Sequence, residues 1–197
     1  MRCAVRLGPH VSEEGRCPHC RTQTFPFRST RAAFDYAGAV RAQVHAAKFN
    51  GQWTVCERLV SAFLSAVRAE DIPPEVALVV PVPMHWWSRR VRGVHLACAL
   101  SSGLAAAHGI EHRAFALRQL RPSRPQYTLR PAERFRSVAG LFAVNDDCSV
   151  SGRHVLLVDD VMTTGATASA CARLLRSAGA SAVHVAVLAR TPPPEGA

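Results

Sequence analysis

Short uninterrupted apolar runs alternate along this chain with longer segments in which apolar residues recur every three or four positions. The runs predict strands buried on both faces of a parallel sheet, and the periodic segments predict helices. Strands are expected at 33–37, 77–80, 114–117, 154–158 and 183–188. Helices are expected at 40–49, 54–67, 96–107 and 168–175, with a capping box from Thr54 to Glu57 and a helix end at Gly109. This alternation predicts an α/β fold with a doubly wound parallel sheet.

Length and composition indicate one core with a small appendage. The chain has 197 residues and 48% apolar content, which is enough for one core. We expect a polar, cysteine-bearing segment at 1–30, the α/β domain at 31–190 and a proline-rich tail at 191–197. No apolar run approaches the roughly twenty residues of a membrane span. The first thirty residues hold no signal-peptide core, so we expect a cytoplasmic protein.

The net charge of +10 is carried almost wholly by arginine. Arginine suits bidentate contacts with phosphate better than lysine does. The excess therefore indicates anionic partners, either phosphorylated metabolites or nucleic acid. An arginine-rich genome composition accounts for the same excess, so charge alone does not choose a partner.

The stretch 154–167 carries the candidate chemistry. Its apolar run ends in two adjacent carboxylates, Asp159 and Asp160, whose side chains point to opposite sides of a strand. Hydroxyls and a glycine follow at 163–167, where a helix begins, and free N–H groups and the helix dipole favour an anion there. Carboxylates beside such a site suit a phosphorylated ribose with Mg²⁺.

Other protein classes also place acids after an apolar run. A Walker B strand requires a P-loop lysine, but Lys48 is the only lysine and Phe49-Asn50-Gly51 follows it. A two-component receiver needs an aspartate and a lysine downstream, and neither follows Asp160. A haloacid-type phosphatase needs Asp-x-Asp, and the spacing here differs. A structural strand ending in two solvated carboxylates stays open as the alternative.

The sequence Val-Asp-Asp-Val-Met-Thr-Thr-Gly-Ala-Thr at 158–167 resembles the phosphoribosyl-pyrophosphate (PRPP) signature of type I phosphoribosyltransferases. The wider chain, from about residue 17 to residue 190, is similar to the competence-associated ComF branch of that superfamily. The resemblance implies that amides at 163–167 hold the 5-phosphate, that the acids hold the ribose hydroxyls directly or through Mg²⁺, and that arginines meet the pyrophosphate. The implied PRPP residues are Asp159, Asp160, Thr163, Thr164, Gly165, Ala166, Thr167, Arg89 and Arg90. Among them, Asp159, Asp160 and Arg89 are the candidate catalytic residues.

The segment after the strand at 77–80 resembles the family's arginine-rich pyrophosphate turn. Arg89, Arg90, Arg92 and Gly93 match that pattern, but Val-His-Leu at 94–96 replaces Phe-Asn-Gln and removes polar groups from the site. The tandem tryptophans at 86–87 are interpreted as packing over the sheet edge, with stacking on a base as the alternative.

Two further segments match the family by position. Lys48 with Phe49 resembles a Lys-Phe pair of the family, and we interpret Lys48 as a solvated helix end rather than a ligand contact. The basic stretch 118–136 resembles the family's flexible segment, with Arg124, Gln126 and Arg134 as its candidate substrate residues. Such a loop closes over the substrate and excludes water. A solvated basic loop is the alternative.

The cysteines indicate no disulfide framework, because the seven are scattered. Cys56, Cys98 and Cys171 lie in apolar helical patterns and are expected in the core. Cys17 and Cys20 form half of a tetrahedral zinc knuckle. Either they bind Zn²⁺ with further ligands, or they are a plain reduced pair.

Two functions remain compatible with these patterns. The first is PRPP binding with Mg²⁺ and transfer of the phosphoribosyl group to an acceptor that the sequence does not name. The second, which the ComF resemblance implies, is a non-catalytic competence protein that holds single-stranded DNA during uptake, together with the competence machinery. A glutaminase half is not expected, because the chain is too short for one.

Overall fold

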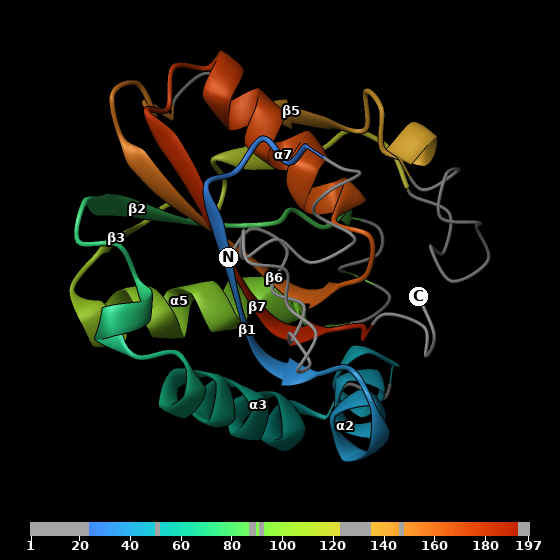
Figure 1. Cartoon of the computed structure of the whole chain (residues 1–197). Helices are drawn as coiled ribbons and strands as arrows, with labels where there is room; N and C mark the ends of the chain where they lie inside the picture. Colours follow the sequence, from blue (N-terminus) through green and yellow to red (C-terminus); the bar gives the residue numbers. More distant parts are fainter. Residues whose placement is uncertain are drawn as a thin grey trace, which may run out of the picture.

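The computed structural model describes residues 24–49, 52–86, 90, 93–122, 135–145 and 148–192. Its central feature is a five-stranded sheet in which every pair of neighbours is parallel (Figure 1). The strands, in their spatial order, are β1 (Ser29–Asp35), β7 (Ala182–Arg190), β6 (His154–Met162), β2 (Val76–Pro81) and β3 (Glu111–His112). The predicted parallel α/β sheet is confirmed.

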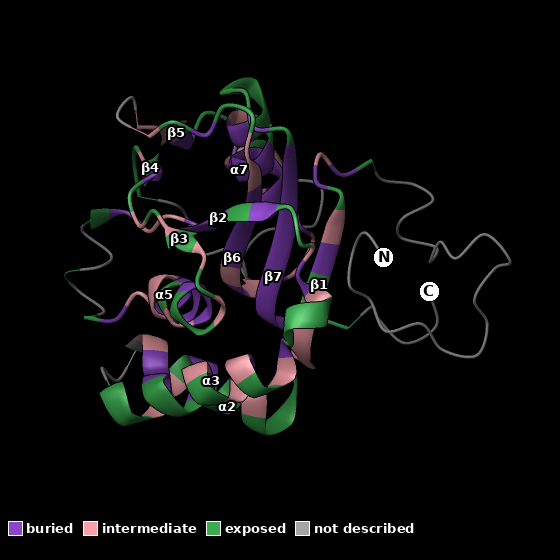
Figure 2. Ribbon diagram, turned by 90° about the vertical axis from the view of Figure 1, so that its left-hand side faces the viewer, coloured by how far each residue is buried: buried purple, intermediate pink, exposed green. Residues whose placement is uncertain are grey.

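Helices cover both faces of this sheet, as a doubly wound fold requires. One face carries α2 (Gly38–Phe49), α3 (Trp53–Ala66) and α5 (Leu96–His108), and a short 3₁₀ turn (Ala69–Asp71) follows α3. The other face carries α7 (Ala166–Ser177) and an antiparallel pair, β4 (Leu117–Gln119) with β5 (Phe142–Val144). Figure 2 shows the buried strands β6 and β7 between these two layers.

The two central strands explain why the fold divides into two cores. Side chains alternate along β6, so Val155 and Leu157 pack towards α7, while Leu156 and Val158 pack towards α3 and α5. Every residue of β7 is buried. Phe25 and Phe27, which stack with ring centroids 5.0 Å apart, extend the core on the α7 side. Strands buried on both faces therefore read as continuous apolar runs in the sequence.

Several local predictions need correction. The capping box from Thr54 to Glu57 is wrong: α3 begins at Trp53 with Gln52 as its N-cap, and no side-chain cap bond forms. The strand expected at 114–117 starts only at Leu117, because the preceding residues form a turn. Cys98 is half-buried, whereas Cys56 and Cys171 lie in the core as expected. Gly109 ends α5 in the left-handed conformation, as predicted.

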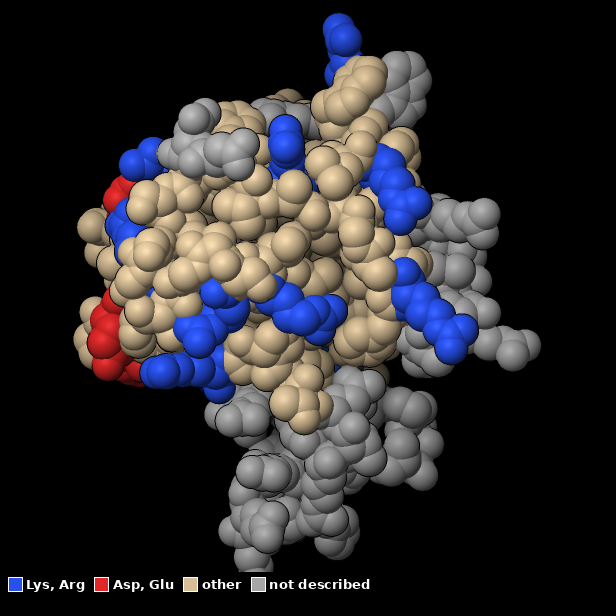
Figure 3. All heavy atoms as spheres, turned by 90° about the horizontal axis from the view of Figure 1, so that it is seen from above, with Lys and Arg blue, Asp and Glu red and all other residues tan. Residues whose placement is uncertain are grey.

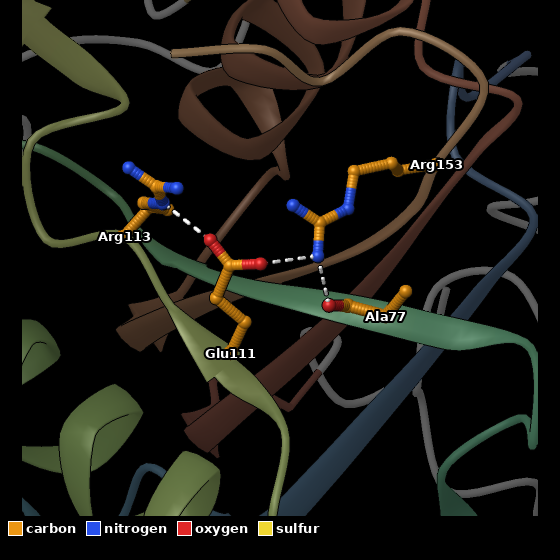
Figure 4. Close-up of polar contacts among 4 residues, drawn as sticks. All are labelled: Ala77, Glu111, Arg113 and Arg153. Carbon is orange, nitrogen blue, oxygen red and sulfur yellow. Dashed lines mark hydrogen bonds and ion pairs between the residues drawn. The ribbon is translucent and has the colours of Figure 1, made fainter.

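A polar network fixes the short edge strand β3. Glu111 accepts hydrogen bonds from Arg113 and, at 2.6 Å, from Nη2 of Arg153, which also donates to the carbonyl of Ala77 at 2.6 Å (Figure 4). These two arginines lower the pKa of Glu111 to about 2. The network connects β3 to β2 and to the loop before β6.

No helix in the described part of the chain is long and apolar enough to cross a membrane.

Candidate functional site

The candidate site lies where β2 ends beside the final part of β6, which continues to Met162. Pro81 pairs with Val158, and the amide of Val82 donates to the carbonyl of Val158 at 2.8 Å. The loop that follows β2 therefore starts next to the two acids of β6. Ligands of open α/β sheets bind at this carboxyl edge of the strands. His95, which stands at the N-cap of α5, makes a hydrogen bond between its Nε2 and the carbonyl of Val82 at 3.0 Å.

The two acids of β6 have different surroundings. Asp159 follows Val155 and Leu157 on the face of α7, whereas Asp160 faces α2. The backbone amide of Asp160 donates to Oδ1 of Asp159 at 2.8 Å. Asp159 is half-buried, and Asp160 is only 8% exposed. The predicted divergence of the two side chains is therefore present.

The pKa of Asp159 is strongly raised. Burial, and in second place the charge of Asp160, raises its pKa to about 8. The fully buried Cys171 of α7 has its own thiol pKa raised, mainly by burial and additionally by Asp159. A carboxyl group with a raised pKa in a site of this kind is a functional candidate, because folding gains little from holding it there.

Lys48 forms an ion pair with Asp160, the other acid of β6. Its Nζ donates to Oδ1 of Asp160 at 2.7 Å, from the last turn of α2. The two side chains are only 20% and 11% exposed. The interpretation of Lys48 as a solvated helix end is therefore wrong, because tertiary packing brings the end of α2 over the end of β6. The sequence signal for this contact is that Lys48 is the only lysine in an arginine-rich chain.

The loop 163–167 leads from β6 into the first turn of α7. Gly165 is the N-cap, in the left-handed conformation with φ of 79°, and α7 has no side-chain cap. The amide of Ala166 makes a long hydrogen bond of 3.4 Å to Oγ1 of Thr164. Thr163 and Thr167 are partly exposed. The first-turn amides of a helix have no partner within the helix, and such a helix start is the kind of corner at which an anion can bind.

Two apolar side chains that the sequence analysis did not identify hold this loop in place. A Cβ built on Gly165 would lie 2.7 Å from Cε of Met162 and 3.1 Å from Cε1 of Phe25. Both side chains are buried. They pack against the backbone of the loop, and Thr163 and Thr167 are partly exposed beside it.

The loop after β2 contacts the antiparallel pair. The amide of His85 donates to Oε1 of Gln119 in β4 at 3.1 Å. The ring centroids of His85 and Trp86 lie 5.6 Å apart. Trp86 is 60% exposed, so the interpretation that it packs over the sheet edge is wrong. Arg90 is exposed on the same loop.

The remaining predicted site residues lie outside the described part of the chain. They are Arg89 of the pyrophosphate turn, the basic-loop residues Arg124, Gln126 and Arg134, the tryptophan at 87, and the cysteines Cys17 and Cys20. Within the described ranges, no group of three or more His, Cys, Asp or Glu side chains is placed to hold a metal. Asp159 offers carboxylate oxygens, which Mg²⁺ prefers. No ion pair to it is found among the described residues. The side chain of Asp159 is therefore of a chemical type that can hold a divalent cation.

Comparison with known proteins identifies the family of this chain. Residues 92–196 match the family described as phosphoribosyl transferase domain. The DNA utilization protein YhgH of Salmonella typhi is 30% identical over 182 residues, which is 89% of this chain and 78% of that protein. Competence protein F of Haemophilus influenzae is 29% identical over 148 residues, covering 73% and 64% of the two chains. A solved adenine phosphoribosyltransferase from Thermoanaerobacter pseudethanolicus has a TM-score of 0.43 and 17% identity, over 72% of each chain. The chain therefore belongs to the phosphoribosyltransferase superfamily, in the competence-associated branch of the ComF and YhgH proteins.

Proposed function

We propose that this protein binds PRPP with Mg²⁺ at the carboxyl edge of β6 and transfers its phosphoribosyl group to an acceptor. One observation supports the proposal. The two acids of β6, the threonines of the next loop and the start of α7, which has no side-chain cap, follow one another directly along the chain. The amides and hydroxyls of 163–167 would hold the 5-phosphate. Asp159 would hold the ribose hydroxyls, and Arg89 and Arg90 would contact the pyrophosphate.

The roles of these residues follow from the charges that develop during transfer. Positive charge builds at the anomeric carbon as pyrophosphate leaves, so the reaction needs positioning and electrostatic stabilisation more than a strong base. Asp159, in its ionised form, would stabilise that charge across the ribose ring. Mg²⁺, when bound, supplies charge neutralisation for the pyrophosphate. The basic stretch that contains Arg124, Gln126 and Arg134 would close over the ligand and exclude water.

Calorimetric titration of PRPP in the presence of Mg²⁺ tests the proposal. We expect saturable binding to the wild type, and a loss of affinity of about a hundredfold or more in the Asp159→Asn/Asp160→Asn protein, because two hydroxyl-binding carboxylates are removed. Glu70→Gln/Glu75→Gln, which removes two acids far from this site along the chain, is the matched control and should bind normally. A wild type that does not bind PRPP would refute the proposal.

Single-stranded DNA is the second candidate ligand. Viewed from the side of α7 and β5, the surface carries scattered Lys and Arg side chains, and Asp and Glu are seen only at one edge (Figure 3). The exposed arginines of α7 and of the segments around β4 and β5 are Arg118, Arg121, Arg136, Arg173 and Arg176. The exposed Trp86 provides a ring on which a base can stack. The names of the relatives, which refer to DNA utilization and competence, agree with such a role.

Binding of single-stranded DNA can be tested by varying the salt concentration and by replacing arginines. We expect binding of a fluorescent oligonucleotide to weaken steeply with salt, with a log–log slope of about −0.7 for each phosphate contact. Arg173→Gln/Arg176→Gln should weaken binding severalfold more than Arg41→Gln/Arg58→Gln, which removes the same charge from α2 and α3 on the opposite face. Equal loss in both variants would show that only the net charge matters.

A further inference from the structure

The ion pair between Lys48 and Asp160 lies inside the candidate site, and the proposed use of the acids does not yet account for it. It joins residues 112 positions apart at 2.7 Å, and both side chains are mostly buried. Partly buried charges cost free energy unless they are paired. A surface arginine in place of Lys48 would have been typical of a chain with 23 other basic residues, but the chain places its single lysine here.

The ion pair with Lys48 gives Asp160 and Asp159 different hydrogen-bond partners. One oxygen of Asp160 is held by Lys48, and the backbone amide of the same residue holds Oδ1 of Asp159. Pairing with β7 on either side of Asp160 fixes the backbone of β6, so the contact with Lys48 determines how the Asp160 carboxylate is oriented rather than where the strand lies. The compact ammonium at the end of α2 therefore acts on the site through the Asp160 side chain.

Resting on the proposed function, we infer that Lys48 is a positioning residue of the PRPP site. Its ammonium holds one oxygen of the Asp160 carboxylate from the side of α2, so that only the second oxygen of Asp160 is left to accept from a ribose hydroxyl. α2 lies on the face of the sheet opposite α7. Through Lys48, its last turn nevertheless takes part in ligand binding.

A double-mutant cycle tests the inference, because it separates a residue that acts through Asp160 from one that touches the ligand. PRPP with Mg²⁺ is titrated into the wild type, Lys48→Met, Asp160→Asn and the double variant at a temperature well below unfolding. Removing a residue that orients a ligand-binding group typically weakens binding 10–100-fold, so we expect about a tenfold loss in each single variant. The double variant should be no weaker than either single one. Lys48→Arg, which keeps the charge, should recover most of the affinity.

Other results would overturn the inference in distinguishable ways. Losses that multiply in the double variant would show that Lys48 contacts the ligand itself. Unchanged affinity in Lys48→Met, together with a lower urea midpoint, would show a purely structural ion pair. A wild type that binds no PRPP would end the proposed function and this role with it, whereas the other two results leave PRPP binding intact and reject only the role of Lys48.

Discussion

Replacing Asp159 by Asn is expected to make the protein more stable while weakening PRPP binding. The folded state raises the pKa of Asp159 to about 8, mainly through burial. A group whose pKa is raised by folding contributes stability below its unfolded pKa and loses that contribution as pH rises towards the folded value. The wild type should therefore lose stability through this residue between about pH 4 and pH 8.

The magnitude follows from the same shift. Each pKa unit corresponds to about 1.4 kcal/mol, and partial exposure of Asp159 reduces the total, so we expect Asp159→Asn to be about 2 kcal/mol more stable than the wild type at pH 8. The two proteins should be similar near pH 3, where Asp159 is mainly neutral in both states. Urea unfolding at both pH values, without Mg²⁺, measures the difference.

Asp160→Asn is the matched control for this prediction. It removes a carboxylate at the next position, but it leaves Lys48 without its partner. We therefore expect Asp160→Asn to be less stable than the wild type at pH 8, the opposite sign. If both variants lost stability equally at pH 8, burial would not be the main cause of the raised pKa of Asp159.

Gly165→Ala is expected to damage both the fold and the ligand site. The residue has φ of 79°, and its new Cβ would lie 2.7 Å from Met162 and 3.1 Å from Phe25. The left-handed conformation costs an L-residue about 1–2 kcal/mol, and overpacking adds about 1–3 kcal/mol. We expect the free energy of unfolding to fall by about 2–5 kcal/mol, and PRPP affinity to fall because the loop must move.

Gly140→Ala separates the two causes. Gly140 also has a positive φ, of 61°, but nothing lies within 4 Å of a Cβ built on it. Its replacement should therefore cost only the conformational part, about 1 kcal/mol, and should leave PRPP binding unchanged. Urea midpoints of the two variants measure the difference. Equal losses would mean that Met162 and Phe25 move aside freely.

The sequence predicted the sheet and the candidate loop well because both depend on local patterns. Strands buried on both faces leave continuous apolar runs, as in β2, β6 and β7. The order of acids, hydroxyls and glycine at 159–167 is likewise contained in one segment. Short elements were missed: β3 spans two residues and β5 three, which is too short for a periodic signal. The capping box failed because α3 begins earlier, at Trp53, without a side-chain cap.

By itself, the sequence determined the α/β class, the parallel sheet and the segment that ends β6, since each depends on the chemistry of neighbouring residues. Only the tertiary structure decided that Lys48 pairs with Asp160, that Phe25 and Met162 pack on Gly165, and that burial perturbs Asp159. The physical reason is distance along the chain. Contacts such as the one across 112 positions arise from helix–sheet packing, which leaves no periodic pattern near either partner.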